Sequence, residues 1–265
     1  MKTALITGGA GGLGFEFARL AAKDGYQIVL ADVQAEALQN AQKTLEKDYG
    51  VKVHTIQKNL ASPDAGKEVF EELQKHQLKI TILVNNVGIG TFGELWEVDW
   101  ARQNTLLQLN VHLLTQLTYL LLPDMLAQKS GKILNMASMA AFQPCPFMAT
   151  YYASKAYVLS LTESLANELK GTGVTATVFC PGPIPTGFQD AVAKRNQKLN
   201  FTIFHDTPER SARTGYRAMM AGKTVVVNTW INWLMSAMPR FLPRKVIVGF
   251  TRKMQESNAK SIVKK

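Results

Sequence analysis

The chain has 265 residues, of which 46% are hydrophobic and 19% are charged, a composition typical of a globular protein that can bury one large core. Its two cysteines, Cys145 and Cys180, lack paired spacing and its four histidines are scattered, so the sequence predicts neither a disulfide framework nor a metal site. Most of the net charge of +10 lies in residues 229–265, with eight Lys or Arg against one acid, and no nucleic-acid-binding module is visible, so no nucleic-acid partner is expected.

Apolar segments of strand length alternate with segments of helical periodicity as far as about residue 228. Apolar strands joined by helices of this length predict a parallel sheet covered on both faces, and right-handed crossovers make it doubly wound. We therefore expect an α/β fold with a doubly wound seven-stranded parallel sheet in one catalytic domain, residues 1–228, and an extension, residues 229–265. Strands are expected at residues 3–7, 27–31, 52–57, 80–85, 131–136, 174–180 and 223–228, and helices at 12–24, 34–48, 63–76, 98–126, 150–170 and 207–221.

The N-terminus shows no secretory signal, because Met1 and Lys2 are followed at once by the first strand and a glycine-rich turn. No apolar run approaches the ~20 residues that a transmembrane helix needs. The leucine-rich stretch from Leu106 to Met125 contains several polar residues and is expected to be a buried helix. A cytoplasmic location is the expectation that follows.

The turn after the first strand reads Thr7-Gly8-Gly9-Ala10-Gly11-Gly12-Leu13-Gly14 and leads into a predicted amphipathic helix. Glycines at 8, 12 and 14 allow a tight turn, close approach of the backbone to a phosphate, and close packing of helix on strand. The start of the helix favours negative charge. The turn, with Gly8, Gly12, Leu13 and Gly14, is thus a predicted dinucleotide-binding site, and a plain glycine-rich loop is the alternative.

The second predicted strand ends in Asp32. A carboxylate at this position accepts hydrogen bonds from the adenosine ribose hydroxyls and repels a 2′-phosphate. Neither the glycine turn nor Val33 supplies the cation that a phosphate-binding pocket would need. NAD is therefore the expected cofactor and NADP the less favoured one, unless Asp32 merely caps the following helix.

Tyr151 and Lys155 stand four residues apart in a predicted helix, with Ser138 upstream. Four residues is just over one turn, so both side chains leave the same face. Tyrosine has an ordinary pKa of about 10, and a neighbouring cation favours the phenolate, so the pair could donate and accept a proton near neutral pH. Alone, such a pair is usually an ordinary surface pair, but downstream of the glycine turn it indicates catalysis.

Taken in order, these motifs make the chain similar to the classical short-chain dehydrogenase/reductase family. The resemblance covers about residues 3 to 228 and departs from the family pattern in three places: Ala137 stands where many members have Ser, Val87 where they have Ala, and Asn59 where many have Asp. The motifs that carry it are Thr7-Gly8 to Gly14, Asn85-Asn86-Val87-Gly88, Asn110, Ser138, Tyr151 with Lys155, and Pro181-Gly182.

The resemblance implies a catalytic role for four residues. Tyr151 would exchange the proton between phenol and substrate oxygen, while Lys155 lowers the pKa of the phenol and bonds the nicotinamide ribose. Ser138 would polarise the carbonyl oxygen, and Asn110 would hold a water that connects Lys155 to solvent. Tyr152 also lies near the same face, but the family spacing selects Tyr151. Such a site would interconvert a secondary alcohol and a ketone by hydride transfer.

The resemblance also implies cofactor contacts away from the glycine turn. Asn85 and its neighbours would close the fourth strand near the adenine side. The proline-rich segment after the sixth strand would contact the nicotinamide, unless it is a purely structural turn, and Ile184 is one of its few backbone N–H donors. The implied contacts, besides Tyr151 and Lys155, are Asn59, Leu60, Asn86, Gly88, Pro181, Gly182, Ile184 and Thr186.

The residues between the catalytic serine and tyrosine, 139–150, are mostly apolar and uncharged, which favours an apolar ketone or secondary alcohol as substrate. The loop 187–206 carries Lys194, Arg195 and Lys198, which could meet an acidic group but are more often solvated. A catalytically silent dinucleotide sensor or scaffold is the alternative, although such a protein would need only the glycine turn and Asp32.

The extension 229–265 combines Trp, Leu, Met and Phe with basic clusters and resembles the apolar, basic C-terminal extensions of a subset of the family. Such a composition suits the surface of an anionic membrane or a cover over a long apolar pocket. Packing of the apolar residues on the body or on a second subunit is the alternative. Relatives commonly form homodimers or homotetramers through the helices near 98–126 and 150–170.

Overall fold

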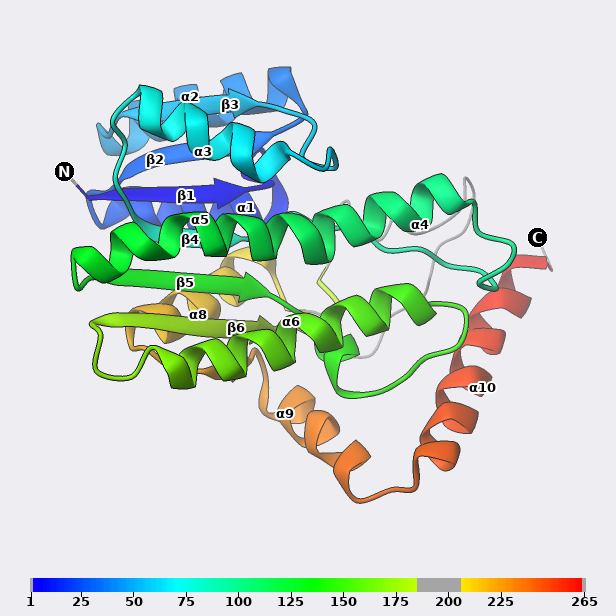
Figure 1. Cartoon of the computed structure of the whole chain (residues 1–265). Helices are drawn as coiled ribbons and strands as arrows, with labels where there is room; N and C mark the ends of the chain where they lie inside the picture. The colour runs from blue at the N-terminus through cyan, green and yellow to red at the C-terminus, as the bar shows by residue number, and fades with distance from the viewer. Residues whose placement is uncertain (1, 185–205, 264–265) are drawn as a thin grey trace.

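The computed structural model describes residues 2–184 and 206–263, with side chains of the last helix described as far as residue 256. Seven strands form one parallel sheet in the order β3-β2-β1-β4-β5-β6-β7 (Figure 1). This confirms the doubly wound fold predicted from the sequence, with a shorter last strand than expected. The strands are β1 (Thr3–Thr7), β2 (Gln27–Asp32), β3 (Val53–Gln57), β4 (Ile80–Asn85), β5 (Gly131–Met136), β6 (Val174–Cys180) and β7 (Val225–Val227).

Helices cover both faces of the sheet, because successive strand residues point to opposite faces. In β1, Ile6 packs in the core beneath one helix layer and Leu5 in the core beneath the other, and both are fully buried. Figure 1 shows α3 (Ala65–Lys75), α5 (Leu114–Ala127) and α6 (Ala149–Glu168) in front of the sheet. The layer behind it contains α1 (Gly12–Lys23), α2 (Ala35–Tyr49) and α8 (Pro208–Met220).

The helix predicted at 98–126 is divided by a π-helical segment. It consists of α4 (Trp100–Leu107), the segment η1 (Gln108–Leu113) and α5, which continue one another. One-turn π segments inside α-helices frequently occur at functional sites, because the extra residue turns a side chain to a new direction. Here the segment contains Asn110, one of the predicted catalytic residues.

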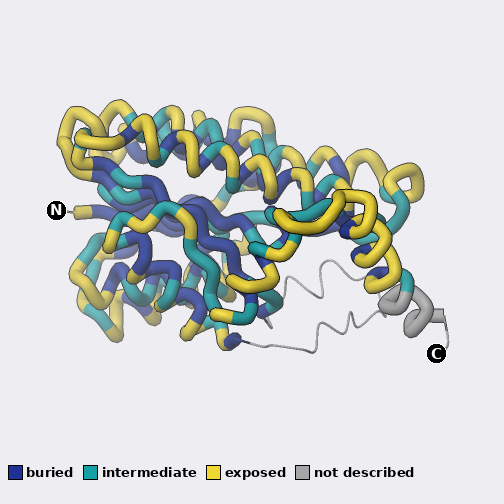
Figure 2. Tube along the Cα trace, turned by 90° about the horizontal axis from the view of Figure 1, so that it is seen from below, coloured by how far each residue is buried: buried dark blue, intermediate teal, exposed yellow. Residues whose placement is uncertain are grey.

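The C-terminal arm, defined as α9 (Trp230–Ala237), the 3₁₀ turn η3 (Met238–Arg240) and α10 (Arg244–Val263), lies beyond the carboxyl ends of the strands (Figure 1). Over the described residues, no helix is both long and apolar enough to cross a membrane. The arm instead presents most of its length to solvent, as the exposed colouring near the C-terminus in Figure 2 shows.

Candidate active site

The glycine turn lies where neighbouring strands β1 and β4 lead to connections on opposite sides of the sheet. At such a switch point the two outgoing loops leave a crevice that binds ligands. The side chain of Asn86 joins these loops, since its Nδ2 donates to the carbonyls of Thr7 at 3.0 Å and Gly8 at 3.1 Å. A Cβ on Gly14 would lie 2.0 Å from the Gly8 carbonyl oxygen, so helix α1 can approach the turn only with glycine at this position.

The start of α1 fits the pyrophosphate of a dinucleotide. Its N-cap residue, Gly11, has no side-chain cap, and the first turn of α1 contains no acidic residue. A Cβ on Gly11 would meet no atom within 4 Å, so the backbone here borders open space. Gly12 has a φ of +54° and Leu13 is half-buried. Uncapped backbone N–H groups beside free space are the features that an anion needs at a helix start.

Asp32 lies beside this turn at the end of β2. Its Oδ2 accepts from the Ala10 backbone N–H at 3.2 Å, and its Oδ1 accepts from Val33 and Gln34 at 2.8 and 3.2 Å. The carboxylate thus ties the glycine turn to the second strand and precedes the α2 helix, which begins at residue 35. A carboxylate offers about four acceptor sites, so capacity remains for a ribose hydroxyl.

The other residues predicted on the adenine side, Asn59, Leu60 and Asn85, differ in burial and in their hydrogen bonds. Asn59 is exposed and its Oδ1 accepts from the Ala61 N–H at 3.1 Å, whereas Leu60 is buried. Asn85 ends strand β4, and its side chain forms hydrogen bonds within the core. Its Nδ2 donates to the side chains of Thr118 and Asn135, and the residue is only 3% exposed, so it joins β4 to its neighbours in the core.

Tyr151, Ser138 and Lys155 lie together at the carboxyl ends of β5 and β6. Tyr151 is 8% exposed and packs in a small apolar cluster, and its phenol shares a hydrogen bond with Ser138. Lys155 is also buried, with its Nζ 5.8 Å from the centre of the Tyr151 ring. The Lys155 Nζ donates to the carbonyl of Met136 at 2.8 Å. The helix α6 therefore presents both groups on one face, as the spacing predicted.

Burial dominates the electrostatics of the Tyr151 and Lys155 pair. Burial raises the pKa of Tyr151 to about 12, and the hydrogen bond with Ser138 lowers it only in part. Burial also lowers the pKa of Lys155 to about 8. Desolvation in the apolar cluster is the main cause of both shifts, and the lowering of the phenol pKa by Lys155 stays a prediction. At neutral pH the phenol carries its proton and the ammonium remains largely charged.

Asn110 holds the chain that follows β4. Its Oδ1 accepts from the backbone N–H of Ile89 and its Nδ2 donates to the Ile89 carbonyl, both at 3.0 Å. The same Nδ2 lies 3.1 Å from the Ser154 Oγ. A Cβ on Gly88 would lie 2.9 Å from the Asn110 Oδ1 and 3.5 Å from the Lys155 Nζ. Glycine at 88 therefore lets the backbone pass between these two polar side chains.

Tyr152 occupies a different environment from Tyr151. Its phenol forms hydrogen bonds with the thiol of Cys145 and with Gln255 of the C-terminal arm, and burial raises its pKa well above the ordinary value. The two rings meet edge to face with centres 6.0 Å apart. Since Ser138 bonds to Tyr151 and not to Tyr152, the structure favours the assignment that the family spacing made.

The segment after β6 is held by residues that the sequence gave no reason to select. The N–H of Gly182 donates to the Asn228 Oδ1 at 3.1 Å, and Asn232 of α9 donates to the same oxygen at 2.8 Å. A Cβ on Gly182 would lie 2.3 Å from the Asn232 amide nitrogen. Pro181 and Ile184 are buried, while the expected contacts at Thr186, Lys194, Arg195 and Lys198 lie outside the described residues.

The predicted substrate-lining segment, residues 139–150, begins with the 3₁₀ turn η2 (Met139–Phe142), which is capped by Ser138. Phe147 has a φ of +66°, an unfavourable conformation for a residue with a side chain, and its ring stacks on Phe92 with centres 6.1 Å apart. The arm contacts this segment through Thr251, whose hydroxyl lies 3.1 Å from the Pro144 carbonyl. Apolar walls and a polar triad thus meet at one end of the sheet.

Comparisons with known proteins agree with this geometry. The family described as short chain dehydrogenase matches residues 2–197. A diacetyl reductase, (S)-acetoin forming, from Staphylococcus epidermidis is 30% identical over 203 residues, which cover 76% of this chain and 79% of the relative.

Two solved structures at 26% identity are similar over most of the fold. A short chain dehydrogenase/reductase from Burkholderia phymatum in complex with NAD has a TM-score of 0.79 and covers 89% of this chain and 91% of its own. L-sorbose reductase from Gluconobacter frateurii, complexed with NADPH and L-sorbose, has a TM-score of 0.73 and covers 85% and 93%. This chain belongs to the short-chain dehydrogenase/reductase family, whose members are oxidoreductases that act on CH–OH groups with a nicotinamide dinucleotide.

Proposed function

We propose that this protein interconverts a secondary alcohol and a ketone on an apolar substrate, with Tyr151 as the general acid and base. The observation that carries the proposal is the buried triad, in which the Tyr151 phenol shares a hydrogen bond with Ser138 and lies beside Lys155. A bound nicotinamide dinucleotide supplies the hydride in reduction and accepts it in oxidation. We propose residues 1–228 as the catalytic domain that performs this chemistry.

The residues of the chain supply the proton and the orientation. With its pKa raised to about 12, the Tyr151 phenol is protonated at neutral pH and can donate its proton to the oxygen of a carbonyl substrate. Ser138 can donate to the same oxygen and so stabilise the negative charge that develops there. The Lys155 ammonium stabilises the phenolate that remains, and Asn110 is proposed to hold the water through which Lys155 exchanges protons with solvent.

We propose NAD as the preferred cofactor. Asp32 supports this, because its carboxylate keeps acceptor capacity beside the glycine turn and would repel a 2′-phosphate. The proposed cofactor contacts are those implied by the family resemblance, with Asn86 acting through the Thr7 and Gly8 carbonyls that it holds. Comparing kcat/KM with NADH and with NADPH tests the assignment, and a clear preference for NADPH would contradict it.

A variant and its control sharpen this test. Replacing Asp32 by Ala should narrow the preference for NADH over NADPH, since the repulsion of a 2′-phosphate is removed. Replacing the neighbouring Gln34 by Ala serves as the control, because its side chain carries no charge. If both variants keep the same cofactor ratio as the wild type, Asp32 is not the selecting residue.

The proposed substrate is a small apolar ketone or alcohol. The apolar cluster around Tyr151 includes Ala140 and Met148, with Phe92 packed against it. Within the described part of this lining, residues 139–150 contain no charged side chain that could clamp a carboxylate or phosphate. A panel of aliphatic, aromatic and steroid-like ketones, followed by NADH absorbance, would identify the class. No turnover on any ketone or alcohol, with intact dinucleotide binding, would support a silent sensor instead.

We propose a homodimer or homotetramer formed through the outer surfaces of α4, α5 and α6. Large side chains are exposed on this surface, among them Trp100 at 71% and Tyr119 at 75%. Tyr157 of α6 is also exposed and meets Thr115 of α5 through a hydroxyl contact of 3.0 Å. Light scattering on the wild type and on Tyr119→Glu would test this surface, since a buried glutamate should dissociate the assembly.

We also propose a cytoplasmic protein whose C-terminal arm makes a peripheral contact with an anionic membrane. The arm reverses the usual arrangement, because its buried side chains are mainly polar and its apolar ones face outward. Among the side chains described up to residue 256, the buried ones are Asn232, Ser236, Ile247, Thr251 and Gln255. The exposed apolar residues include Trp230, Trp233, Leu234, Met235, Met238, Phe241, Leu242, Val246 and Phe250. Exposed apolar surface of this extent marks an interaction site.

The charges on the arm favour lipid over a second copy of the arm. Arg240, Arg244 and Lys245 are exposed at the junction of α9 and α10. The acidic residue Glu256 is already paired with Arg252 at 2.7 Å. Each cation near an anionic surface contributes about 1 kcal/mol, whereas two copies of the arm would bring like charges together. Exposed tryptophans on the same arm as these cations suit the headgroup region of a bilayer.

Flotation with vesicles tests the contact. Full-length protein should bind phosphatidylcholine vesicles that contain phosphatidylglycerol at low salt, lose most binding at high salt, and ignore phosphatidylcholine alone. Replacing Trp230 and Trp233 by Ser should abolish binding. Replacing Leu95 and Trp96 by Ser is the matched control, since these are similarly exposed, at 59% and 80% against 74% and 63%, and lie outside the arm and outside α4. Protein that stays unbound under all conditions rejects the lipid contact, and an arm variant that only dissociates the oligomer supports subunit packing.

A further inference from the structure

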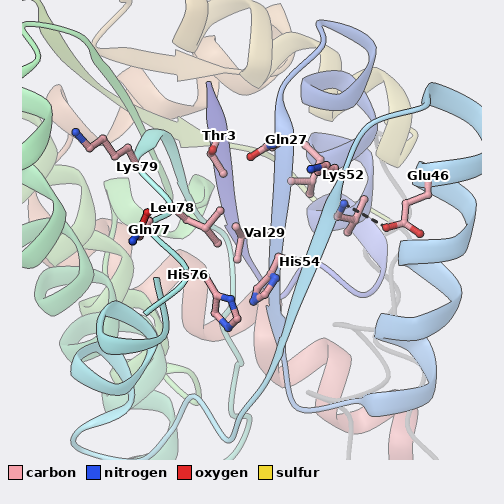
Figure 3. Close-up of a pocket in the computed structure, with 12 residues that line it drawn as sticks. Thr3, Gln27, Val29, Glu46, Lys52, His54, His76, Gln77, Leu78 and Lys79 are labelled. Carbon is pink, nitrogen blue, oxygen red and sulfur yellow. Dashed lines mark hydrogen bonds between the residues drawn. The ribbon is translucent and has the colours of Figure 1, made fainter. Parts of the chain in front are cut away.

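Two histidines that are far apart in the sequence meet at the edge of the sheet. His54 is at the start of β3, the edge strand, and His76 is at the C-cap of α3. Because α3 runs back along the sheet after β3 ends, its last turn returns to the beginning of β3. Figure 3 shows the two rings side by side. Their centres are 4.3 Å apart, and the planes are tilted by 57° and so are not stacked in parallel.

A carboxylate completes this group. Glu72 stands four residues before His76, one turn away on the same face of α3, and its Oε1 lies 2.9 Å from the His76 Nε2. One ligand atom from each of His54, Glu72 and His76 lies within 4.8 Å of the others. In the described residues this is the one group of three or more His, Cys, Asp or Glu side chains with this proximity.

We propose that His54, Glu72 and His76 form a binding site for a divalent transition-metal ion, with Zn²⁺ as the best match. Imidazole nitrogen suits zinc, nickel and copper, and a set of two histidines and one glutamate leaves the fourth position of a tetrahedral zinc ion open. His54 and His76 also line a cavity of about 680 Å³, so water or a small ligand can reach that position (Figure 3).

Three lysines near the site oppose the charge of a metal ion. Lys75 lies 3.7 Å from a Glu72 oxygen, and Lys52 and Lys79 line the cavity. We therefore expect moderate affinity, in the micromolar range.

The position of the site separates it from the reaction. Its residues lie at the amino ends of the strands, with Thr3 and Gln27 beside them in the cavity wall, whereas Tyr151 lies beyond the carboxyl ends. A bound ion would link the edge strand β3 to α3, a connection between two elements that otherwise pack through apolar side chains. The site is thus expected to stabilise the fold and to leave hydride transfer unchanged.

Zinc binding to the full-length protein tests the proposal. After treatment with a chelator and its removal, the protein should take up one Zn²⁺ per chain, as measured by competition with a zinc-sensitive dye and by elemental analysis. Zinc should also raise the melting temperature. Replacing His54, Glu72 or His76 singly by Gln should weaken binding at least about tenfold, since changes to groups that only support a ligand already have effects of this size.

His112 provides the matched control, because it is exposed and lies outside the group. The His112→Gln variant should bind Zn²⁺ as the wild type does. Circular dichroism and NADH binding verify that each variant is folded. Two results would overturn the proposal. One is a wild-type protein that takes up less than one zinc per chain at micromolar zinc. The other is zinc binding by the His54, Glu72 and His76 variants that is as tight as that of His112→Gln.

Discussion

The catalytic body and the C-terminal arm place their residue types in opposite ways. In the body, Phe17 and Phe179 are fully buried and meet edge to face. In the arm, Asn232 and Gln255 are buried while Trp230 is 74% exposed. The same apolar residue types therefore form an internal core in the body and an exposed surface, suited to a partner, in the arm. The difference is that another element of the chain covers the apolar face of a helix or strand in the body but not in the arm.

The buried polar residues of the arm contact two segments that border the active site, the segment after β6 and residues 139–150. Asn232 fills the space beside Gly182, after β6. Gln255 donates to the Cys145 sulfur at 3.5 Å and to the Met148 sulfur at 3.8 Å. The arm and the catalytic centre therefore both bury polar side chains at specific positions, whereas the core of the body buries apolar ones. Four substitutions, three in the body and one in the arm, test what these buried positions contribute.

Replacing Tyr151 by Phe should have the largest effect, a loss of turnover of about 10³-fold or more, because the proton donor is removed from the reaction. NADH binding should stay within about twofold of wild type, as the ring remains in its apolar cluster. Steady-state assays and fluorescence titration with NADH measure the two quantities. The Tyr152→Phe variant is the control and should remain active. If Tyr152→Phe is the inactive one, the assignment is wrong.

Replacing Gly14 by Ala should destabilise the body by about 3 kcal/mol or more, because the new Cβ would meet the Gly8 carbonyl at 2.0 Å and backbone cannot move aside cheaply. NADH binding should be lost with it. Gly11→Ala is the matched control, since its Cβ would meet nothing within 4 Å. Urea denaturation of both variants measures the difference. Equal stability of the two variants would show that the backbone at Gly8 can shift at little cost to make room for a Cβ at position 14.

Replacing Lys155 by Met should abolish activity but stabilise the protein. The lowered pKa, from 10.5 to about 8, means that burial of the charged ammonium destabilises the folded wild type by about 3 kcal/mol. The variant loses the hydrogen bond to the Met136 carbonyl, which costs it about 1 kcal/mol. The variant should therefore be about 2 kcal/mol more stable than the wild type. Melting curves should show a rise of roughly 5 °C at neutral pH.

The pH dependence of this gain has a definite sign. Between pH 8 and 10.5 the unfolded wild type binds more protons at Lys155 than the folded one, so wild-type stability rises with pH there. The advantage of Lys155→Met should therefore be full below pH 8, decrease as the pH rises, and reverse to a deficit of about 1 kcal/mol towards pH 10.5, where only the lost bond to the Met136 carbonyl remains. A variant that is less stable than wild type at pH 7 would mean that the buried ammonium is better solvated than its surroundings indicate.

The fold could be predicted because alternation and spacing are local signals. The strands from β1 to β6 begin and end within a residue of the predicted bounds, and Tyr151 with Lys155 follows from helical geometry. Residues brought together by the tertiary fold gave no such signal. The contact between His54 and His76 depends on α3 returning along β3. The π-helical segment contains Asn110, whose amide bonds to Ile89 and Ser154, residues that are distant in the sequence. The raised pKa of Tyr151 depends on burial, which a motif does not contain.

The smallest expected effect concerns the contact between the arm and the substrate-lining segment. Replacing Gln255 by Leu removes its donors to Cys145 and Met148 and should raise KM for an apolar ketone severalfold, while NADH affinity stays unchanged. The stability change should be about 1 kcal/mol, the usual contribution of such bonds. Lys253→Ala is the control, because that side chain is exposed on the same helix. If KM is equal in the two variants, the arm does not shape the substrate site, and its buried polar face serves only to hold the apolar face outward.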